Sequence, residues 1–318
     1  MKPIRRAVID IGTNSVKLLV ADVIGRQIQP VHEESKQTRL GSGFYETQRL
    51  QPDAIAATAA AIADFAGAAR SLGTDSIRVI ATSATREAKN SQELLDAIQR
   101  AAGVTVEIIS GEKEADLGFQ GVTTDPDLAD APLLLMDVGG GSTEFILGRG
   151  REKYFRQSFP LGTVRLLETS RYDDPPSPQQ FTACRDGIRQ FLRQKVSPQL
   201  APELQRQKKS GSPDSELIFI GVGGTASILA CMESQLEAFD RTRVEATRLS
   251  DARLARHVAR LWSLPLEERK KIIGLPKNRA DVILTGVTIY QEVMQEFGFH
   301  ELRISTRGLR FAAVMEPQ

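Results

Sequence analysis

Cysteine, histidine and net charge are all scarce in this sequence. Its 318 residues include two cysteines and three histidines, and the formal net charge is +1. Cys184 and Cys231 cannot build a disulfide framework and lack the spacing of metal ligands. The histidines form no metal-binding pair. A net charge near zero gives no overall attraction toward nucleic acid or an anionic membrane, so we expect neither as a partner.

Long apolar runs are also absent. No stretch approaches the roughly 18 consecutive apolar residues of a membrane-spanning helix. Residues 1–6 lead directly into a predicted strand and leave no apolar signal region. We therefore expect a cytoplasmic protein. The apolar fraction of 41% and the charged fraction of 25% are ordinary for a globular protein, and the length suffices for two cores.

The most informative stretch is residues 133–144, where an apolar run ends in Asp137 and is followed by Gly139, Gly140 and Gly141. An unbroken apolar run predicts a strand that is buried on both faces. Glycines permit positive φ and a close approach to a ligand, and consecutive backbone N–H groups in such a turn form an anion site. A carboxylate beside an anion site favours a bridging divalent cation. The alternative is a tight hairpin whose aspartate makes only turn bonds.

The same pattern stands near the N-terminus. Residues 7–11 form an apolar strand that contains Asp10, and a glycine and three polar residues follow: Thr13, Asn14 and Ser15. The two aspartates are roughly one domain length apart. Two copies at this spacing predict two lobes, each presenting a phosphate-binding hairpin and one carboxylate to a shared cleft.

The two loops resemble the phosphate loops of the actin-like ATPase superfamily. The residues of the two loops are more similar still to those of the exopolyphosphatase and guanosine pentaphosphate phosphohydrolase (Ppx/GppA) family in its short two-domain form. Residues 81–88, 109–115 and 221–225 also carry this resemblance and follow the family's order. It implies an α/β protein of two actin-like (ribonuclease H-like) lobes, with mixed β-sheets flanked by helices and an active site in the interlobe cleft.

The polar segment of residues 125–132 is the best domain boundary. We expect an N-terminal lobe over residues 1–124, with residues 303–318 as a candidate completion, and a C-terminal lobe over residues 125–302. Alternating helices and strands in the first lobe independently favour the α/β class. Residues 205–216 are polar and contain glycine and serine, which is typical of a surface loop.

The resemblance assigns roles to single residues. It implies that Glu114 orients or deprotonates an attacking water and that Glu144 assists metal or water placement. Arg86 becomes a phosphate ligand. From residue type alone, an acid in a first helical turn is favoured by the macrodipole, and an arginine at a helix start is a solvated side chain. Family members commonly carry acids near Thr306 and Phe311, and this sequence does not.

A third glycine turn follows a later buried strand and contains Gly223, Gly224 and Thr225. In the actin-like interpretation it lines the cleft near the nucleoside or the distal phosphates. It also fits the G-x-G-x-x-A pattern of dinucleotide sites. That pattern needs an acid that ends a second strand, and no apolar strand precedes Glu237 or Asp240.

These residues together predict phosphoryl transfer to water, which needs positioning and charge neutralisation more than covalent work. Asp10 and Asp137 would hold Mg²⁺ through coordinated water, Glu114 would act on the attacking water, and Glu144 would be a second acid. The residues assigned to phosphate binding are Thr13, Asn14, Ser15, Arg86, Gly139, Gly140, Gly141, Ser142, Gly223, Gly224 and Thr225.

Three functions remain open, in this order. The first is a phosphoanhydride hydrolase of the exopolyphosphatase type, which releases the terminal phosphate of inorganic polyphosphate. The second is hydrolysis of the 5′-phosphate of guanosine pentaphosphate (pppGpp), which requires every one of the same catalytic parts. The third is a non-catalytic module that senses phosphate or nucleotide. A homodimer is compatible with the sequence.

Overall fold

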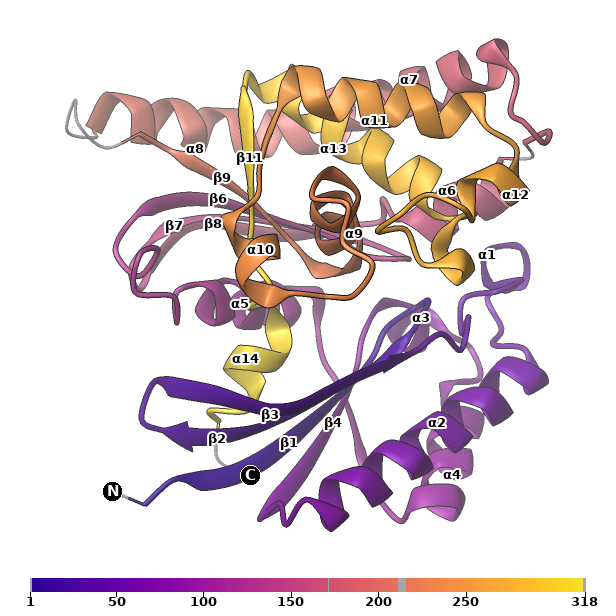
Figure 1. Cartoon of the computed structure of the whole chain (residues 1–318), viewed down its shortest axis with the longest axis vertical. Helices are drawn as coiled ribbons and strands as arrows, with labels where there is room; N and C mark the ends of the chain where they lie inside the picture. Colours follow the sequence, from indigo (N-terminus) through magenta and orange to yellow (C-terminus); the bar gives the residue numbers. More distant parts are fainter. Residues whose placement is uncertain (1, 171, 211–215, 317–318) are drawn as a thin grey trace. The chain divides into compact units, whose positions relative to one another are not determined.

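The computed structural model describes residues 2–170, 172–210 and 216–316. The chain divides into two compact units (Figure 1). Unit 1 comprises Met1–Pro126 and Arg307–Gln318, and unit 2 comprises Asp127–Thr306. Each unit is built on a mixed β-sheet with flanking helices, which confirms the predicted α/β class.

Unit 1 contains a five-stranded sheet in the order β3–β2–β1–β4–β5. Strands β1, β2 and β3 pair antiparallel, whereas β1, β4 and β5 pair parallel. The elements of unit 1 are β1 (Ile4–Ile11), β2 (Val16–Ile24), β3 (Gln27–Lys36), α1 (Phe44–Thr47), α2 (Pro52–Ser71), β4 (Ser76–Ala81), α3 (Ser83–Glu87), α4 (Ser91–Ala102), β5 (Val106–Ile108), α5 (Gly111–Val122) and α14 (Leu309–Ala313).

Both faces of the unit 1 sheet are covered, as the apolar run in β1 predicts. Ile9 and Ile11 pack into an apolar cluster with residues of α2 and α4. Val8, which points to the other face, packs into a second cluster with residues of α5 and α14. Figure 1 shows these two pairs of helices on opposite sides of β1 and β4. The central strand is therefore held from both sides, and its end is fixed in place.

Unit 2 contains a six-stranded sheet in the order β10–β11–β9–β6–β7–β8. Strands β6, β7 and β8 pair antiparallel, β6, β9 and β11 pair parallel, and β10 is antiparallel to β11. The elements of unit 2 are β6 (Pro132–Val138), β7 (Thr143–Arg149), β8 (Glu152–Phe159), α6 (Thr163–Thr169), α7 (Pro178–Phe191), the π-helical turn η1 (Leu192–Val196), α8 (Ser197–Ser210), β9 (Ile218–Val222), α9 (Gly223–Glu233), α10 (Arg241–Ala246), β10 (Arg248–Ser250), α11 (Asp251–Ser263), α12 (Leu266–Arg269), the 3-10 turn η2 (Lys277–Arg279), α13 (Ile283–Phe297) and β11 (Glu301–Ile304).

One continuous apolar cluster forms the core of unit 2. Leu134, Met136 and Val138 of β6 contribute to it, together with buried residues of α7, α8, α9, α11 and α13. Met136 and Val138 lie on either side of Asp137, so the strand that carries this aspartate is anchored in the core at its very end. In the described part of the chain, no helix has both the length and the apolar character needed to cross a membrane.

The prediction of a loop over residues 205–216 is wrong in its first half. Helix α8 continues to Ser210, and residues 211–215 lie outside the described residues. Residues 205–209 are glutamine, arginine and lysine, which are good helix formers. A polar composition was therefore mistaken for irregular structure, when it belongs to a solvent-facing helix.

Gly121→Ala is expected to destabilise unit 1. A Cβ at this position would lie 2.2 Å from the carbonyl oxygen of Gly308 and 2.8 Å from that of Arg307, so the backbone between α5 and α14 must shift. We expect the free energy of unfolding to fall by about 1–3 kcal/mol, measured by denaturant titration.

Gly67→Ala is the matched control, because Gly67 is exposed within helix α2 and a Cβ there meets no heavy atom within 4 Å. It should stabilise the protein by up to about 1 kcal/mol. Equal effects of the two substitutions would contradict the close approach at Gly121.

Candidate active site

The first hairpin presents Asp10 at the end of β1 and closes with a four-residue turn. The amide of Gly12 donates to the carbonyl of Ser15 at 3.0 Å, and the amides of Arg39 and Gly41 donate to the carbonyls of Asn14 and Thr13 at 3.0 and 2.7 Å. The carbonyls of the loop are thus occupied from one side by residues 39–41. The glycine-containing segment that follows β3 therefore serves to hold the first loop.

The second hairpin repeats this turn at Asp137. The amide of Gly139 donates to the carbonyl of Ser142 at 2.9 Å. The first amides of α6, those of Thr163 and Val164, donate to the carbonyls of Gly139 and Gly140 at 3.0 and 2.9 Å. The glycine loop is therefore fixed by the start of a helix, just as residues 39–41 fix the first loop.

Gly162, which precedes α6, makes this fixation sterically possible. A Cβ at Gly162 would lie 2.4 Å from the carbonyl oxygen of Gly140. Arg165 of α6 adds a side-chain hydrogen bond from Nε to the carbonyl of Gly141 at 2.8 Å. Residue type alone did not identify Gly162, because its role depends on a contact with a loop 22 residues earlier in the chain.

The two hairpins differ at one cross-strand position. Asp10 is directly opposite Lys17 in the β1–β2 pair, whereas Asp137 is directly opposite Glu144 in the β6–β7 pair. Directly opposed residues of an antiparallel pair lie on the same face of the sheet. The first hairpin thus places a carboxylate beside an ammonium group, whereas the second hairpin places two carboxylates side by side.

Asp10 lies in a setting that disfavours its charge yet supplies cations. Burial raises the pKa of Asp10 above its ordinary value, and the nearby charges of Lys17 and Arg310 oppose that rise. Arg310 opens the last helix of unit 1 and donates from Nη1 to the carbonyl of Leu18 at 2.6 Å. The last helix of the unit therefore contributes a positive charge close to the first loop, which the sequence did not reveal.

Glu144 is buried and is held by two hydroxyl groups. Ser142 and Ser158 both donate to its Oε1, at 2.7 and 2.6 Å. Ser158 lies on β8, directly opposite Glu144 in the register of β7 and β8. Ser142, predicted as a phosphate ligand, therefore has its hydroxyl directed to Glu144. Its backbone amide remains the group assigned to phosphate.

Glu114 and Arg86 contact each other directly. Glu114 lies in the first turn of α5, whose cap is the Ser110 hydroxyl that accepts from the amide of Lys113 at 3.1 Å. Arg86 donates from Nη1 to Glu114 Oε2 at 3.2 Å and to the carbonyl of Ile109 at 2.9 Å. Arg86 was predicted only as a phosphate ligand, and the structure shows that it also fixes the orientation of the Glu114 carboxylate.

Asn14 carries a buried donor without a partner. Its side chain is 6% exposed, and its Nδ2 finds no hydrogen-bond partner among the described residues. Gln37 donates from Nε2 to Asn14 Oδ1 at 3.0 Å, which leaves Nδ2 as the free end of the amide. A buried donor of this kind is costly unless a ligand satisfies it, so Asn14 fits an anion in the first loop.

The third glycine turn begins where β9 ends beside Asp137. β6 and β9 pair in parallel, with Asp137 in register with Val222. Gly223 has φ of +83°, and a Cβ there would lie 2.2 Å from Asp137 Oδ1. The hydroxyl of Thr225 donates to the carbonyl of Val138 at 3.4 Å. Gly223 and Thr225 thus fix the second loop, while Gly224 has open space around its Cα.

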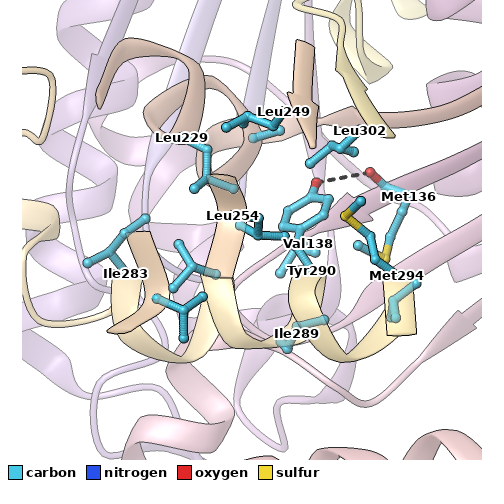
Figure 2. Packing of buried hydrophobic residues seen from close by; sticks show 14 of the residues in the cluster. Met136, Val138, Leu229, Leu249, Leu254, Ile283, Ile289, Tyr290, Met294 and Leu302 are labelled. Carbon is cyan, nitrogen blue, oxygen red and sulfur yellow. Dashed lines mark hydrogen bonds between the residues drawn. The ribbon is translucent and has the colours of Figure 1, made fainter. Parts of the chain in front are cut away.

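Tyr290 of α13 ties the ends of β6 and β9 together. Its hydroxyl lies 3.2 Å from the carbonyl oxygen of Met136 (Figure 2) and 3.3 Å from that of Val222. Complete burial, with a further contribution from the charge of Asp137, raises the pKa of Tyr290 well above its ordinary value. It therefore stays a neutral donor, directly beneath the residues that lead into Asp137 and Gly223.

The dinucleotide interpretation finds no support in this geometry. Asp240 accepts from the amide of Arg243 and caps α10, and Glu237 lies between α9 and α10. Neither acid ends a strand. Gly223, the second glycine of the motif, packs against the carboxylate of Asp137 on the neighbouring strand.

The resemblance implies acids near Thr306 and Phe311, and this chain has other residues at both places. Phe311 is buried in the second apolar cluster of unit 1, and its ring lies 5.8 Å from the guanidinium of Arg307. The hydroxyl of Thr306 donates to the carboxylate of Glu245. An acid is thus present beside Thr306, but it comes from α10.

The described residues contain no group of three or more His, Cys, Asp or Glu side chains arranged to hold a metal ion. The adjacent acids Asp137 and Glu144 nevertheless fit a hard divalent cation such as Mg²⁺, which uses one or two carboxylates and keeps several waters. Two neighbouring carboxylates in a partly buried position also need a positive charge to offset their repulsion.

The predicted residues are divided between the two units. Unit 1 holds Asp10, Thr13, Asn14, Ser15, Arg86 and Glu114. Unit 2 holds Asp137, Gly139, Gly140, Gly141, Ser142, Glu144, Gly223, Gly224 and Thr225. Within the units, the structure joins Arg86 to Glu114 and Ser142 to Glu144.

Comparison with known proteins gives consistent matches over nearly the whole chain. A model of the Ppx/GppA phosphatase family matches residues 19–316. Exopolyphosphatase 2 of Mycobacterium tuberculosis is 32% identical over 321 residues, which is 96% of each chain.

Solved structures agree with this match. An exopolyphosphatase from Cytophaga hutchinsonii is 26% identical, with a TM-score of 0.83, and the match covers 97% of this chain and 96% of that chain. The Ppx/GppA enzyme of Aquifex aeolicus is 29% identical, with a TM-score of 0.77, over 98% of this chain and 99% of that chain. The resemblance and the actin-like α/β fold class predicted from the sequence are confirmed.

Gly223→Ala tests the packing of Asp137 against the third turn. The new Cβ would collide with the carboxylate and would occupy a positive φ, so we expect the free energy of unfolding to fall by about 2–4 kcal/mol. At the adjacent Gly224 a Cβ meets no heavy atom within 4 Å, and Gly224→Ala should change it by less than about 0.5 kcal/mol. Denaturant titration measures both, and an equally tolerated Gly223→Ala would refute the contact.

Proposed function

Because the chain belongs to the Ppx/GppA phosphatase family, we propose that it is an exopolyphosphatase. It removes the terminal phosphate of inorganic polyphosphate by Mg²⁺-dependent hydrolysis, and Glu114 activates the water. The observation that carries the proposal is the contact between Arg86 and Glu114 at the first turn of α5. The relative named exopolyphosphatase 2, aligned over 96% of both chains, supports the choice of substrate.

Glu114 has the features of a positioned base. Its carboxylate is mostly buried and accepts a hydrogen bond from a guanidinium that is itself anchored on the carbonyl of Ile109. A carboxylate fixed in this way holds one orientation toward a water molecule, which is what a general base needs. In an actin-like kinase, a carboxylate at this position would instead take a proton from the hydroxyl group of a second substrate. We propose that water is the acceptor of the phosphate here.

The two loops act on the charge of the substrate. Backbone N–H groups of residues 13–15 and 139–142 would hold the terminal phosphates, and the free Nδ2 of Asn14 would donate to a phosphate oxygen. Lys17, beside Asp10, adds a positive charge to the first loop. Gly224 and its amide are the part of the third turn that remains open to a phosphate.

Asp137 and Glu144 are the residues that would hold Mg²⁺. Asp10, the other carboxylate predicted from the sequence to do so, would contribute less because Lys17 lies directly opposite it. When bound, the ion would neutralise charge on the phosphate oxygens. The hydroxyls of Ser142 and Ser158 orient Glu144 toward this role. The packing of Asp137 against Gly223 limits the positions open to its carboxylate.

The second candidate is hydrolysis of guanosine pentaphosphate. It uses the same loops, acids and water, and the matched family model includes GppA in its description. The two substrates differ in the guanosine, and none of the residues assigned above has a proposed role toward the base. A direct comparison of the two substrates therefore decides between them.

Glu114→Gln is the main test. Phosphate release with Mg²⁺ would be measured on long-chain polyphosphate and on guanosine pentaphosphate. Because the amide cannot take a proton, we expect turnover of the preferred substrate to fall at least about a hundredfold. Glu112→Gln, in the same first turn but exposed, should keep turnover within about twofold.

The outcomes separate the three functions. Turnover of polyphosphate that is lost in Glu114→Gln supports the proposal, and a clear preference for guanosine pentaphosphate favours the second candidate. If neither substrate is hydrolysed by the unmodified protein, a phosphate-sensing module becomes the better explanation. If Glu112→Gln is as slow as Glu114→Gln, the role of Glu114 as the base is refuted.

A further inference from the structure

The last segment of unit 1, residues 307–316, runs antiparallel along helix α5. At one end, the backbone of Gly308 approaches Gly121 so closely that a Cβ would not fit. In the middle, Phe311 and Leu117 belong to the same apolar cluster. At the other end, the carboxylate of Glu316 accepts from Lys113 Nζ at 2.7 Å. We call residues 307–316 the brace, because they contact α5 from its last turn to its first.

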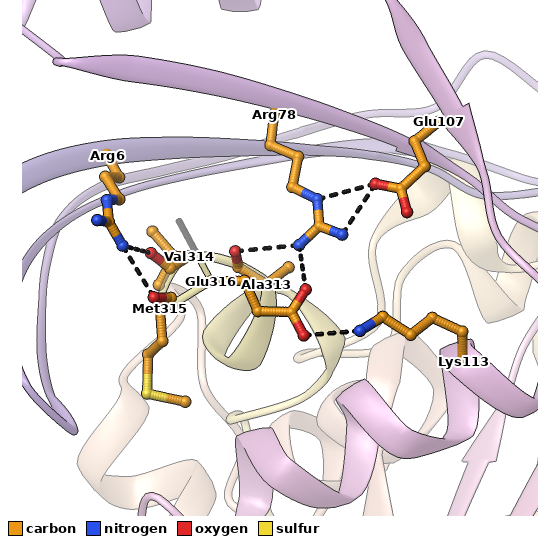
Figure 3. Close-up of polar contacts among 8 residues, drawn as sticks. All are labelled: Arg6, Arg78, Glu107, Lys113, Ala313, Val314, Met315 and Glu316. Carbon is orange, nitrogen blue, oxygen red and sulfur yellow. Dashed lines mark hydrogen bonds and ion pairs between the residues drawn. The ribbon is translucent and has the colours of Figure 1, made fainter. Parts of the chain in front are cut away.

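The end of the brace is anchored on the sheet as well (Figure 3). Arg78 of β4 donates from Nη1 to Glu316 Oε2 at 2.6 Å and from Nε and Nη2 to Glu107 Oε2 of β5 at 3.0 and 2.8 Å. Arg78 is only 14% exposed, so its charge depends on these partners. Glu316 therefore links strand β4 to the first turn of α5 through two ion pairs.

The backbone near Glu316 is fixed by arginines too. Arg6 donates from Nη1 to the carbonyls of Val314 and Met315 at 3.3 and 2.8 Å, and Arg78 Nη1 also lies 3.4 Å from the carbonyl of Ala313. Cationic donors at the carboxyl end of a helix satisfy its last carbonyls and interact favourably with its dipole. The backbone that carries the Glu316 side chain is thus held in position.

The charge of Glu316 is retained in this setting. Burial alone would raise the pKa of Glu316, but hydrogen bonds from Lys113 and Arg78 outweigh burial and hold the pKa below its ordinary value. The carboxylate is therefore ionised at neutral pH and pairs with both cations. Removal of its charge leaves Arg78 with Glu107 and leaves Lys113 without this ion pair.

We propose that Glu316 is a positioning residue for Glu114, acting through Lys113, which rests on the function proposed above for Glu114. Lys113 immediately precedes Glu114 in the first turn of α5. Greater backbone motion at Lys113 therefore also moves Glu114. A catalytic group must be held within about 0.5 Å of its productive position. The ion pair between Lys113 and Glu316 is partly exposed and contributes little to folding stability, so its loss appears in turnover.

Glu316→Gln tests this role, and Glu107→Gln is its matched control. Both remove one carboxylate from Arg78, but only Glu316→Gln removes the ion pair with Lys113. We expect kcat to fall about 3- to 10-fold in Glu316→Gln with KM changed less than about 2-fold, and Glu107→Gln to stay within about 2-fold of the unmodified protein. The double variant Glu316→Gln, Lys113→Met should be no slower than the slower single variant.

An unchanged kcat in Glu316→Gln, or an equal fall in Glu107→Gln, would overturn the proposal. A second readout does not depend on activity. Hydrogen exchange of the amides of residues 113–116 should be faster in Glu316→Gln than in the unmodified protein and in Glu107→Gln. If the unmodified protein hydrolyses no substrate, the proposed function fails while this exchange still tests the brace, and unchanged exchange then refutes it.

Discussion

A single backbone hydrogen bond closes each of the two loops on which the site depends. The bond from Gly12 to Ser15 and the bond from Gly139 to Ser142 both follow a strand-end aspartate by two residues, and the two have almost the same length. Each loop is then held from behind, one by residues 39–41 and the other by the start of α6. The loops are thus ordered by the protein itself, so less conformational entropy would be lost on binding the phosphate groups proposed above.

The shared turn makes the one difference between the hairpins meaningful. In both hairpins the aspartate faces the residue seven positions later, which is Lys17 in unit 1 and Glu144 in unit 2. The ammonium group of Lys17 suits a polyanion, whereas two acids suit a divalent cation. We propose that the same backbone design serves two complementary tasks, set by one side chain on each second strand.

Much of the fold followed from local patterns in the sequence. The apolar runs predicted the strands that are buried on both faces, and the glycines marked the loops. The strands β3 and β8, which extend each hairpin, were not predicted, because their many polar residues resemble a surface segment. The extent of α8 was underestimated for the same reason, since a polar helix and a polar loop have similar compositions.

The supporting residues of the site were harder to identify, because each acts across a large sequence distance. Ser158 reaches Glu144 only through the register of β7 and β8, and Gly223 supports Asp137 only because β9 pairs with β6. In the sequence, Tyr290 resembles the other apolar positions of its helix. Its hydroxyl nevertheless lies within hydrogen-bond distance of carbonyl oxygens at the ends of two strands. Such contacts arise from tertiary pairing, and no local pattern encodes them. The chemical residues, in contrast, stood in short motifs.

The division of tasks between the two hairpins is tested most directly by divalent-cation binding, with Mn²⁺ as a paramagnetic probe in place of Mg²⁺. Binding to the unmodified protein, Asp137→Asn and Asp10→Asn would be followed by electron paramagnetic resonance without substrate. We expect Asp137→Asn to weaken binding at least about tenfold and Asp10→Asn to weaken it less than about threefold. Stronger dependence on Asp10 than on Asp137 would contradict the assignment of the cation to the hairpin with two acids.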